Sequence, residues 1–335
     1  MDMEKGWMHV GEDQHGFTMI ELMLVVTVTL LIATMAFSTL DSTVLSGDTA
    51  QSVSETEENV RAGMSFLARD LIAAGAEIAV GGISVPVGFL PGGVFYSVMP
   101  FANRGPSING MQTDRVMVIY NQLALQGLDV NQSAVAYKIY GVGGIDPNGL
   151  SITIDTTAPN PDASTVAPGD VLLVKTNGAT AISALGYVTD KSVPATIYFT
   201  PGDPLNLNVA GAASKLGALS CQVAQDPGCV DTGVAFKVNI VQYFIDNSGA
   251  NPVLMRQLNG QPPSQLALNI ENLKLNYILR DGSSSPNPAN PPNIRKAGIF
   301  IMGRSGRRGT LNKTYYRFPS SCQVATRNLA YNSSG

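Results

Sequence analysis

The chain has 335 residues, of which only 14% are charged, and its formal net charge is −4. A weakly acidic chain lacks the overall basic character of a general nucleic-acid-binding protein. Its 34 glycines and 20 prolines favour a loop-rich β domain over a bundle of helices.

An apolar segment extends from Phe17 to Leu40 and contains a single charged residue, Glu21. It is long enough to cross a bilayer as a helix. A lone carboxylate near the start of such a helix is costly in lipid, which indicates a function for it. The alternatives are a generic membrane anchor, which has no use for a glutamate one turn into the lipid, and an ordinary secretory signal, whose apolar stretch is shorter and is cleaved at its far end.

The start of this segment resembles the class III signal of type IV prepilins and of type II secretion pseudopilins. The resemblance implies that prepilin peptidase cleaves between Gly16 and Phe17 and that the new amine of Phe17 is methylated. It also implies that Glu21 neutralises the amine of a neighbouring subunit during assembly, with a pair inside one chain as the alternative. The leader departs from the family pattern, in which lysine or arginine usually lies close before the glycine, because Lys5 is its only lysine or arginine. The matching residues are Gly16, Phe17, Thr18, Ile20, Glu21 and Leu22.

Four segments are expected. Residues 1–16 form the cleaved leader, and 17–40 form the transmembrane or filament-core helix. Residues 41–76 continue that helix with an amphipathic face, because apolar residues recur at helical spacing and Gly75 offers a stop. Residues 77–335 form a β-rich head. The apolar stripe comprises Val53, Val60, Met64, Leu67, Leu71 and Ala74.

The head is predicted to be an antiparallel β-sheet with long loops, which makes the fold class α+β. Runs rich in β-branched and aromatic residues, bounded by turns, carry this prediction. Residues 234–246 and 252–258 are predicted to form a hairpin, and 266–279 one helical turn followed by a strand. Further strands are expected at 114–120, 134–141, 150–155, 170–176, 195–200, 294–303 and 313–318.

Several segments of the head are similar to PilW-type minor pilins. They include ARDLIAAG (68–75), DRVMVIY (114–120), VQYFIDNSGANPVLMRQLNG (241–260) and LALNIENLKLNYIL (266–279). This resemblance implies a location in the inner membrane, with a cytoplasmic N-terminus and a periplasmic head, and then in the extracellular pilus. The implied partners are prepilin peptidase, other minor and major pilins, and a tip adhesin.

Both histidines, His9 and His15, lie in the leader. Cleavage would therefore leave no histidine, which argues against Ser-His-Asp and Cys-His catalysis and against most zinc sites. Phosphate-binding motifs are also missing from the sequence. We expect no enzymatic activity, no cofactor and no metal.

Three cysteines are present, Cys221, Cys229 and Cys322. In an exported domain a disulfide is plausible. The favoured pair is Cys221–Cys229, because Asp226-Pro227-Gly228 supplies a turn between them. Pairing of Cys322 with either of the others remains open.

The C-terminal region is basic, since no acidic residue follows Asp281. Arg304, Arg307 and Arg308 form a candidate surface for an acidic partner, a lipid headgroup or DNA, with DNA least favoured. The alternative is that these side chains are solvated or pair with acids elsewhere.

The function expected from these features is that of a minor pilin of a type IV pilus, which contributes to initiating or capping the filament. One alternative is a pseudopilin of a type II secretion system. Another is an adhesive or DNA-binding module at the pilus tip.

Overall fold

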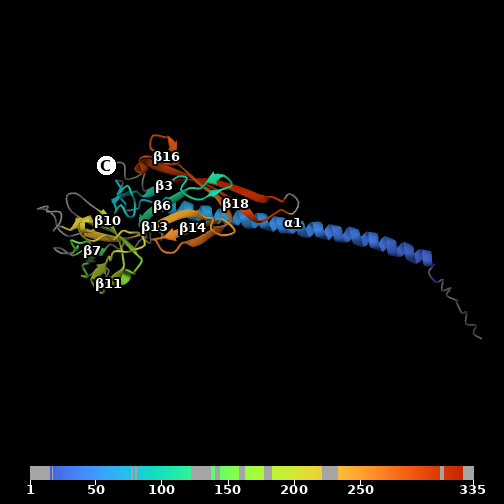
Figure 1. The fold of residues 1–335 in the computed structure, drawn as a ribbon, viewed down its shortest axis with the longest axis horizontal. Coiled ribbons are helices and arrows are strands. Elements are labelled where there is room, and N and C mark those ends of the chain that lie inside the picture. Colours follow the sequence, from blue (N-terminus) through green and yellow to red (C-terminus); the bar gives the residue numbers. More distant parts are fainter. Residues whose placement is uncertain are drawn as a thin grey trace, which may run out of the picture. The chain divides into compact units, whose positions relative to one another are not determined.

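The computed structural model describes residues 16, 18–76, 78–79, 81–121, 137–139, 144–157, 163–176, 183–220, 233–309 and 313–326. Contacts within the chain divide it into two compact units, Met1–Ser52 and Val53–Gly335. The first unit contains the N-terminal part of one long helix, and the second contains the rest of that helix together with the described strands (Figure 1).

The helix α1 extends from Met19 to Ala73 without interruption. No proline occurs before Pro86, so nothing in the sequence removes a helical hydrogen bond. The helix ends where predicted, because Gly75 adopts a left-handed φ of 83°. The amide of Gly75 then donates to the carbonyl oxygen of Ile119, which attaches the helix end to a strand of the head.

A ten-stranded sheet forms one layer of the head, and β13 (Gly233–Asp246) is its central strand. One half of β13 pairs with β14 and β6, and the other half pairs with β9 and β7. The sheet is antiparallel except for the pairing of β1 with β10. Its other strands are β1 (Ile83–Ser84), β2 (Val94–Phe95), β3 (Val98–Phe101), β6 (Arg115–Asn121), β7 (Tyr137–Ile139), β9 (Val171–Thr176), β10 (Ser183–Tyr187), β14 (Val253–Leu258) and β15 (Ser264–Leu268).

A second sheet has the order β17-β16-β18-β19 and is antiparallel throughout. Its strands are β16 (Ile270–Leu279), β17 (Ser284–Ser285), β18 (Ile294–Arg308) and β19 (Tyr315–Ala325). Smaller sheets contain β8 (Ser151–Thr153), β11 (Asp190–Ser192) and β12 (Thr196–Tyr198), and β4 (Ser107–Ile108) with β5 (Met111–Gln112). Short 3-10 helices are η2 (Ala163–Thr165), η3 (Gly211–Ala213), η4 (Gly217–Leu219) and η5 (Pro291–Asn293).

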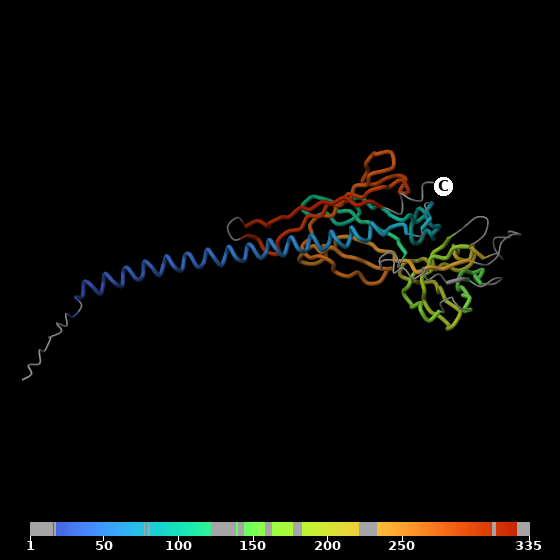
Figure 2. Tube along the Cα trace, turned by 180° about the vertical axis from the view of Figure 1, so that it is seen from behind, coloured from blue at the N-terminus to red at the C-terminus, as the bar shows by residue number. Residues whose placement is uncertain are grey.

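The C-terminal part of α1 packs against both large sheets and supplies the centre of the main core (Figures 1 and 2). The predicted apolar stripe is buried from Val60 onward, with Leu67 and Leu71 fully inaccessible. Gly63 permits close approach, because a Cβ there would lie 2.9 Å from Leu254 of β14 and 3.8 Å from Ile301 of β18. The predicted α+β class, with a long helix on an antiparallel head, is confirmed.

One strand prediction was wrong in its detail. Residues 266–279 were expected to begin with a helical turn, but β15 ends at Leu268 and β16 begins at Ile270. Asn269 lies between them with a φ of 58°, a conformation that asparagine tolerates better than most residues. A single left-handed residue therefore makes the corner that the sequence pattern suggested was a helical turn.

Candidate functional site

The start of α1 carries a capping box made by Thr18 and Glu21. Thr18 is the N-cap residue, because its carbonyl oxygen accepts the amide of Leu22 at 3.1 Å. Its hydroxyl oxygen accepts the amide of Glu21 at 3.3 Å, while one Glu21 carboxylate oxygen accepts the amide and the hydroxyl of Thr18, both at 3.0 Å. The T-x-x-E pattern that signals this box was present in the sequence, but sequence reasoning missed it.

This arrangement places the Glu21 carboxylate close to the predicted cleavage point. Gly16 is exposed, and Phe17 lies outside the described residues. Because residue 17 directly precedes Thr18, cleavage after Gly16 would create an amine next to the residue that Glu21 already binds. Glu21 is also exposed, so its carboxylate is accessible to the amine of another chain.

The helix that follows presents an exposed apolar surface. The apolar part of α1 is fully exposed, and the helix is long and apolar enough to cross a membrane. The threonine hydroxyls in this segment donate to carbonyl oxygens of the preceding turn, as Thr27 does to Met23 and Thr29 to Val25, both at 2.7 Å. These hydroxyl groups therefore keep a hydrogen-bond partner within the helix when it lies in an apolar environment.

At its other end, α1 is anchored to the head through the buried carboxylate of Asp70. One carboxylate oxygen accepts the hydroxyl of Tyr243 at 2.6 Å and two nitrogens of Arg256 at 3.0 Å each. The other oxygen lies 3.4 Å from the hydroxyl of Tyr120. These partners come from β13, β14 and β6, so one carboxylate connects the helix to three strands.

The two tyrosines of this cluster remain hydrogen-bond donors. Burial, with the charge of Asp70 as the next cause, raises the pKa of Tyr120 to about 12. The same causes raise the pKa of Tyr243 well above its usual range. A phenol that stays protonated can donate to Asp70, which offsets the cost of burying that charge. The sequence analysis used the ARDLIAAG segment (68–75) only for its resemblance to PilW-type pilins and assigned no role to Asp70.

The basic C-terminal surface separates into inward and outward residues. Glu271 is fully buried, and its carboxylate oxygens accept Nε of Arg317 at 2.7 Å and Nη1 of Arg304 at 3.4 Å. The side chain of Arg304 is only 13% exposed, and its guanidinium also lies over the ring of Tyr315 at 4.3 Å. The side chain of Arg304 is therefore largely enclosed between Glu271 and Tyr315.

Arg307 and Arg308 are exposed on the same hairpin. Arg308 also lies over the ring of Tyr315, with its guanidinium 5.3 Å from the ring centre. Of the three arginines predicted as a partner surface, the structure thus brings Arg307 and Arg308 to the outside and turns Arg304 toward Glu271.

Of the three cysteines, only Cys322 lies among the described residues. It is a free thiol on β19, with its Sγ atom 3.2 Å from Sδ of Met64 on α1. Burial raises the pKa of this thiol. The predicted Cys221–Cys229 pair lies outside the described residues and stays a prediction.

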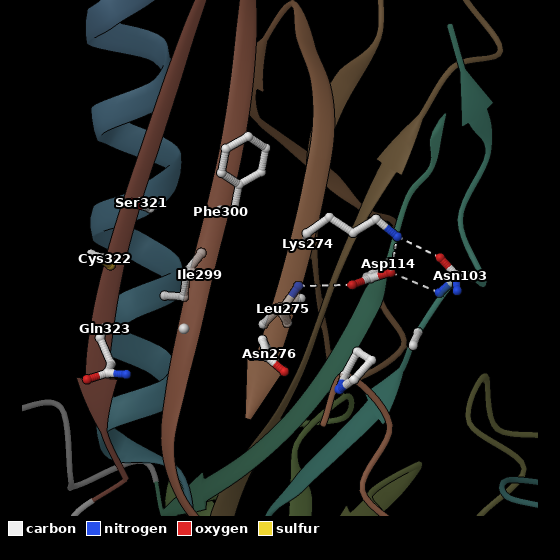
Figure 3. Close-up of a pocket in the computed structure, with 13 residues that line it drawn as sticks. Asn103, Asp114, Lys274, Leu275, Asn276, Ile299, Phe300, Ser321, Cys322 and Gln323 are labelled. Atoms are coloured by element: carbon white, nitrogen blue, oxygen red, sulfur yellow. Dashed lines mark hydrogen bonds and ion pairs between the residues drawn. The ribbon is translucent and has the colours of Figure 1, made fainter. Parts of the chain in front are cut away.

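A groove of about 820 Å³ crosses the β16–β18–β19 sheet (Figure 3). At one end, Asp114 accepts Nζ of Lys274 at 3.0 Å and the amide of Leu275 at 2.9 Å. Asp114 precedes β6, so these bonds join the two large sheets. Among the residues that the structure describes, no group of three His, Cys, Asp or Glu side chains is placed to hold a metal ion.

Comparison with known proteins locates one match, at the N-terminus. Residues 13–37 match the prokaryotic N-terminal methylation motif. No curated protein and no solved structure matches the chain. The motif supports a type IV pilin-like protein or pseudopilin, and it implies processing by a peptidase and association with a membrane. The apolar helix that begins within the matched residues fits membrane anchoring.

Proposed function

We propose that the chain is a PilW-like minor pilin of a type IV pilus. The observation that carries this proposal is the continuity of α1. The helix α1 begins within the methylation motif and carries both the exposed apolar segment and the buried apolar stripe without interruption. Such a helix can hold the precursor in the membrane through its first part while its second part completes the core of an exported head.

The assembly step follows from the chemistry at the start of the helix. Cleavage after Gly16 would leave a cationic amine on Phe17 beside an apolar surface, where an unpaired charge is costly. The exposed Glu21 of a neighbouring subunit can neutralise that amine. The exposed apolar face of α1 would then pack against helices of other pilins in place of lipid.

The resemblance to PilW-type pilins gains support from the way its segments meet in space. Asp70 comes from ARDLIAAG, Tyr120 from DRVMVIY, and Tyr243 and Arg256 from VQYFIDNSGANPVLMRQLNG. These segments are far apart in sequence, yet their polar residues converge on one buried carboxylate. The second compact unit, residues 53–335, is also bulky for a subunit repeated throughout a filament, which favours a minor role over that of a major pilin.

Two measurements test the proposal. Mass spectrometry of protein extracted from membranes should find an N-terminal methyl-phenylalanine at residue 17. Deletion of the gene should reduce the number of pili, with restoration by the wild-type chain. A product that retains Trp7 or begins near residue 40 would contradict the processing step. The same N-terminal features also serve a type II secretion pseudopilin, and deletion that blocks protein secretion with normal pili would favour that alternative.

A further inference from the structure

The groove on the second sheet lies on the face that points away from α1. Ile299 and Ile301 of β18 belong to the core that α1 also enters, and they are 1% and 0% exposed. Because side chains alternate along a strand, the residues next to them point to the other face. With the cross-strand register, this gives the groove six outward residues from three strands, which are Lys274, Asn276, Gly298, Phe300, Ser321 and Gln323.

Gly298 lies at the centre of these residues, and the packing of the chain does not account for it. The strand pairing is regular at Gly298, and its φ lies outside the left-handed region. Among the described residues, a Cβ there would have one atom within 4 Å, the carbonyl oxygen of Asn276 at 3.3 Å. At Gly303 of the same strand, by contrast, a Cβ would lie 2.5 Å from Val60 of α1. A glycine inside a strand lowers stability and is typical of places where a ligand approaches the backbone.

Side chains that can bind hydroxyl groups flank this glycine. Asn276 and Gln323 are its cross-strand partners on the two sides, and Figure 3 shows them on the strands that neighbour the one carrying Phe300. They are exposed, as is Ser321, and none of these three side chains has a hydrogen-bond partner among the described residues. An amide side chain both donates and accepts, as a sugar hydroxyl does. The half-buried ring of Phe300 adds the apolar surface that ligand sites combine with such groups.

The charges beside the groove favour an anionic ligand. Lys274 is matched by Asp114, whose carboxylate lies 3.0 Å from its Nζ atom. Lys296 is exposed and precedes Gly298 by two residues, so it lies on the same face. Within the described part of the chain, no carboxylate pairs with Lys296. Arg104, in the loop that forms the groove wall, is also exposed.

The remaining charges nearby leave this positive excess in place. Glu271, further along the sheet, is bound by both Arg304 and Arg317. Asp281 lies in the turn after β16 and directly follows the exposed Arg280. A carboxylate on the ligand would therefore supply the negative charge that the groove lacks.

We propose that this groove binds an acidic sugar unit, such as a uronic acid residue of a polysaccharide. The carboxylate of the sugar pairs with Lys296, and its hydroxyl groups bind Asn276 and Gln323. The C–H face of its ring lies over Gly298 and beside Phe300. The groove volume of about 820 Å³ is within the range of roughly 300–1,000 Å³ that is usual for ligand sites.

A sugar unit fits this groove better than a nucleic acid does, because the repeated phosphates of a nucleic acid need a run of cations. Lys296 is the cation nearest along the strand to Gly298. None of the groove residues belongs to α1, so the site does not depend on the assembly role proposed for that helix.

The test uses the full chain in detergent and two matched probes. One is a trisaccharide of galacturonic acid, and the other is the same trisaccharide with each carboxylate reduced to a hydroxymethyl group. Saturation-transfer NMR should detect binding of the acidic probe at millimolar concentration. The neutral probe should bind about threefold more weakly, since it lacks an exposed ion pair.

A pair of lysine variants tests the charge. Lys296→Gln should weaken binding of the acidic probe about threefold and leave the neutral probe unchanged. Lys313→Gln removes the same charge from an exposed lysine outside the groove. It should bind both probes as the wild type does.

A second pair of variants tests the shape of the groove. Gly298→Leu projects a side chain into the open space, so it should fold and weaken both probes about tenfold, a loss of about 1.4 kcal/mol. Asn276→Ala combined with Gln323→Ala should also weaken both probes. Because both of these side chains are exposed, the double alanine variant keeps the test valid even if the leucine variant does not fold.

Three results would overturn the proposal. One is the absence of binding of the acidic probe at millimolar concentration. Another is an equal effect of the two lysine variants, which would mean that the chain attracts the probe by its overall charge. The third is an oligothymidylate that binds more tightly than the acidic trisaccharide and is weakened by Gly298→Leu, which would identify a nucleic acid as the ligand.

Discussion

Glu21 is already bound within its own chain, and this affects what a substitution would report. An alanine at position 21 removes both the acceptor that caps α1 and the charge that could neutralise a neighbour's amine. Glutamine keeps a carbonyl oxygen able to accept the Thr18 amide, since both glutamate and glutamine serve in capping boxes. The pair of variants therefore separates the two roles.

We expect Glu21→Gln and Glu21→Ala to lower co-purification with other pilins to a similar extent, about tenfold if the lost charge pair is worth about 1.4 kcal/mol. Thr18→Ala removes the cap hydroxyl and keeps the charge. It should cost about 1 kcal/mol of helix stability with little loss of co-purification. Normal co-purification of the glutamine variant would show that capping, and not charge, is the role of Glu21.

A second prediction concerns Asp70. Removal of its charge from the buried cluster would leave the positive charge of Arg256 without a counter-ion. Asp70→Asn should destabilise the head by about 3–5 kcal/mol, since Arg256 loses its buried counter-ion. The control is Glu57→Gln on the same helix, which removes an exposed pair with Arg61 and should cost about 0.5 kcal/mol or less. Chemical denaturation of the detergent-solubilised chain measures both, and equal effects would argue against a special role for Asp70.

Among the elements, the β18–β19 hairpin combines arginines held by a buried carboxylate with arginines on its exterior. Glu271 holds Arg304 and Arg317, which pair across the two strands, whereas Arg307 and Arg308 lie outside. Arg304→Glu should therefore destabilise the head by about 3 kcal/mol or more, because it places a second carboxylate beside a buried one. Arg307→Glu with Arg308→Glu should leave the melting temperature within a few degrees of the wild type.

The different effects of these substitutions on stability determine which variants can test for a partner surface on this hairpin. Loss of an acidic partner in the Arg307→Glu, Arg308→Glu double variant would be interpretable, because the fold is intact. Loss in any variant that includes Arg304→Glu would not be, since misfolding gives the same result. A double variant that unfolds would contradict the assignment of these two arginines to the exterior.

The contact between α1 and β18 depends on a glycine. A Cβ at Gly303 would lie 2.5 Å from Cγ2 of Val60 and 3.3 Å from Cγ2 of Thr56. Gly303→Ala should therefore cost about 1–3 kcal/mol, the usual range for overpacking. Gly306→Ala on the same strand meets its nearest atom at 3.5 Å and is the matched control. Thermal unfolding distinguishes the two, and equal melting temperatures would refute the close approach.

The elements that sequence could predict are those with a strong local pattern. The long helix, its buried stripe and its end at Gly75 follow from spacing and from the absence of proline. Sequence could not predict Gly303 or Glu271 as contact residues, because their partners lie far away along the chain. The corner at Asn269 was missed for another reason, since one left-handed residue leaves no periodic signal.

The candidate site also contains both residues that could be predicted from the sequence and residues that could not. The cleavage point and Glu21 lie in one local motif, so they could be proposed from sequence. The cluster connects Asp70 to residues 50 to 186 positions away from it in the chain, and no local pattern predicts such a meeting. The contrast between Arg304, which Glu271 holds, and the exposed Arg307 and Arg308 depends on the distant Glu271 of β16 and on the register shift between Arg304 and Arg308, and no local pattern predicts either.

At the scale of the whole molecule, α1 belongs to both compact units, yet its roles in them differ. The helical residues buried in the main core begin beyond Ser52, with Val60, Leu67 and Leu71 fully inaccessible. No residue of the first unit contributes to this core within the part of the chain that is described. The boundary between the units therefore predicts where the chain can be divided without loss of the head.

A chain of residues 53–335 should fold as a soluble head with a melting temperature within a few degrees of the detergent-solubilised full chain. A chain that begins at Gly75 should not fold. It lacks Val60, Leu67 and Leu71, each worth about 1.5–3 kcal/mol when fully buried, and their sum is comparable to the roughly 5–15 kcal/mol that stabilises a typical protein. Circular dichroism and thermal unfolding compare the two, with expression in an oxidising compartment so that the cysteines of the head can pair. A folded product that begins at Gly75 would show that α1 is dispensable to the core, and an unfolded 53–335 would show that the head needs the first unit.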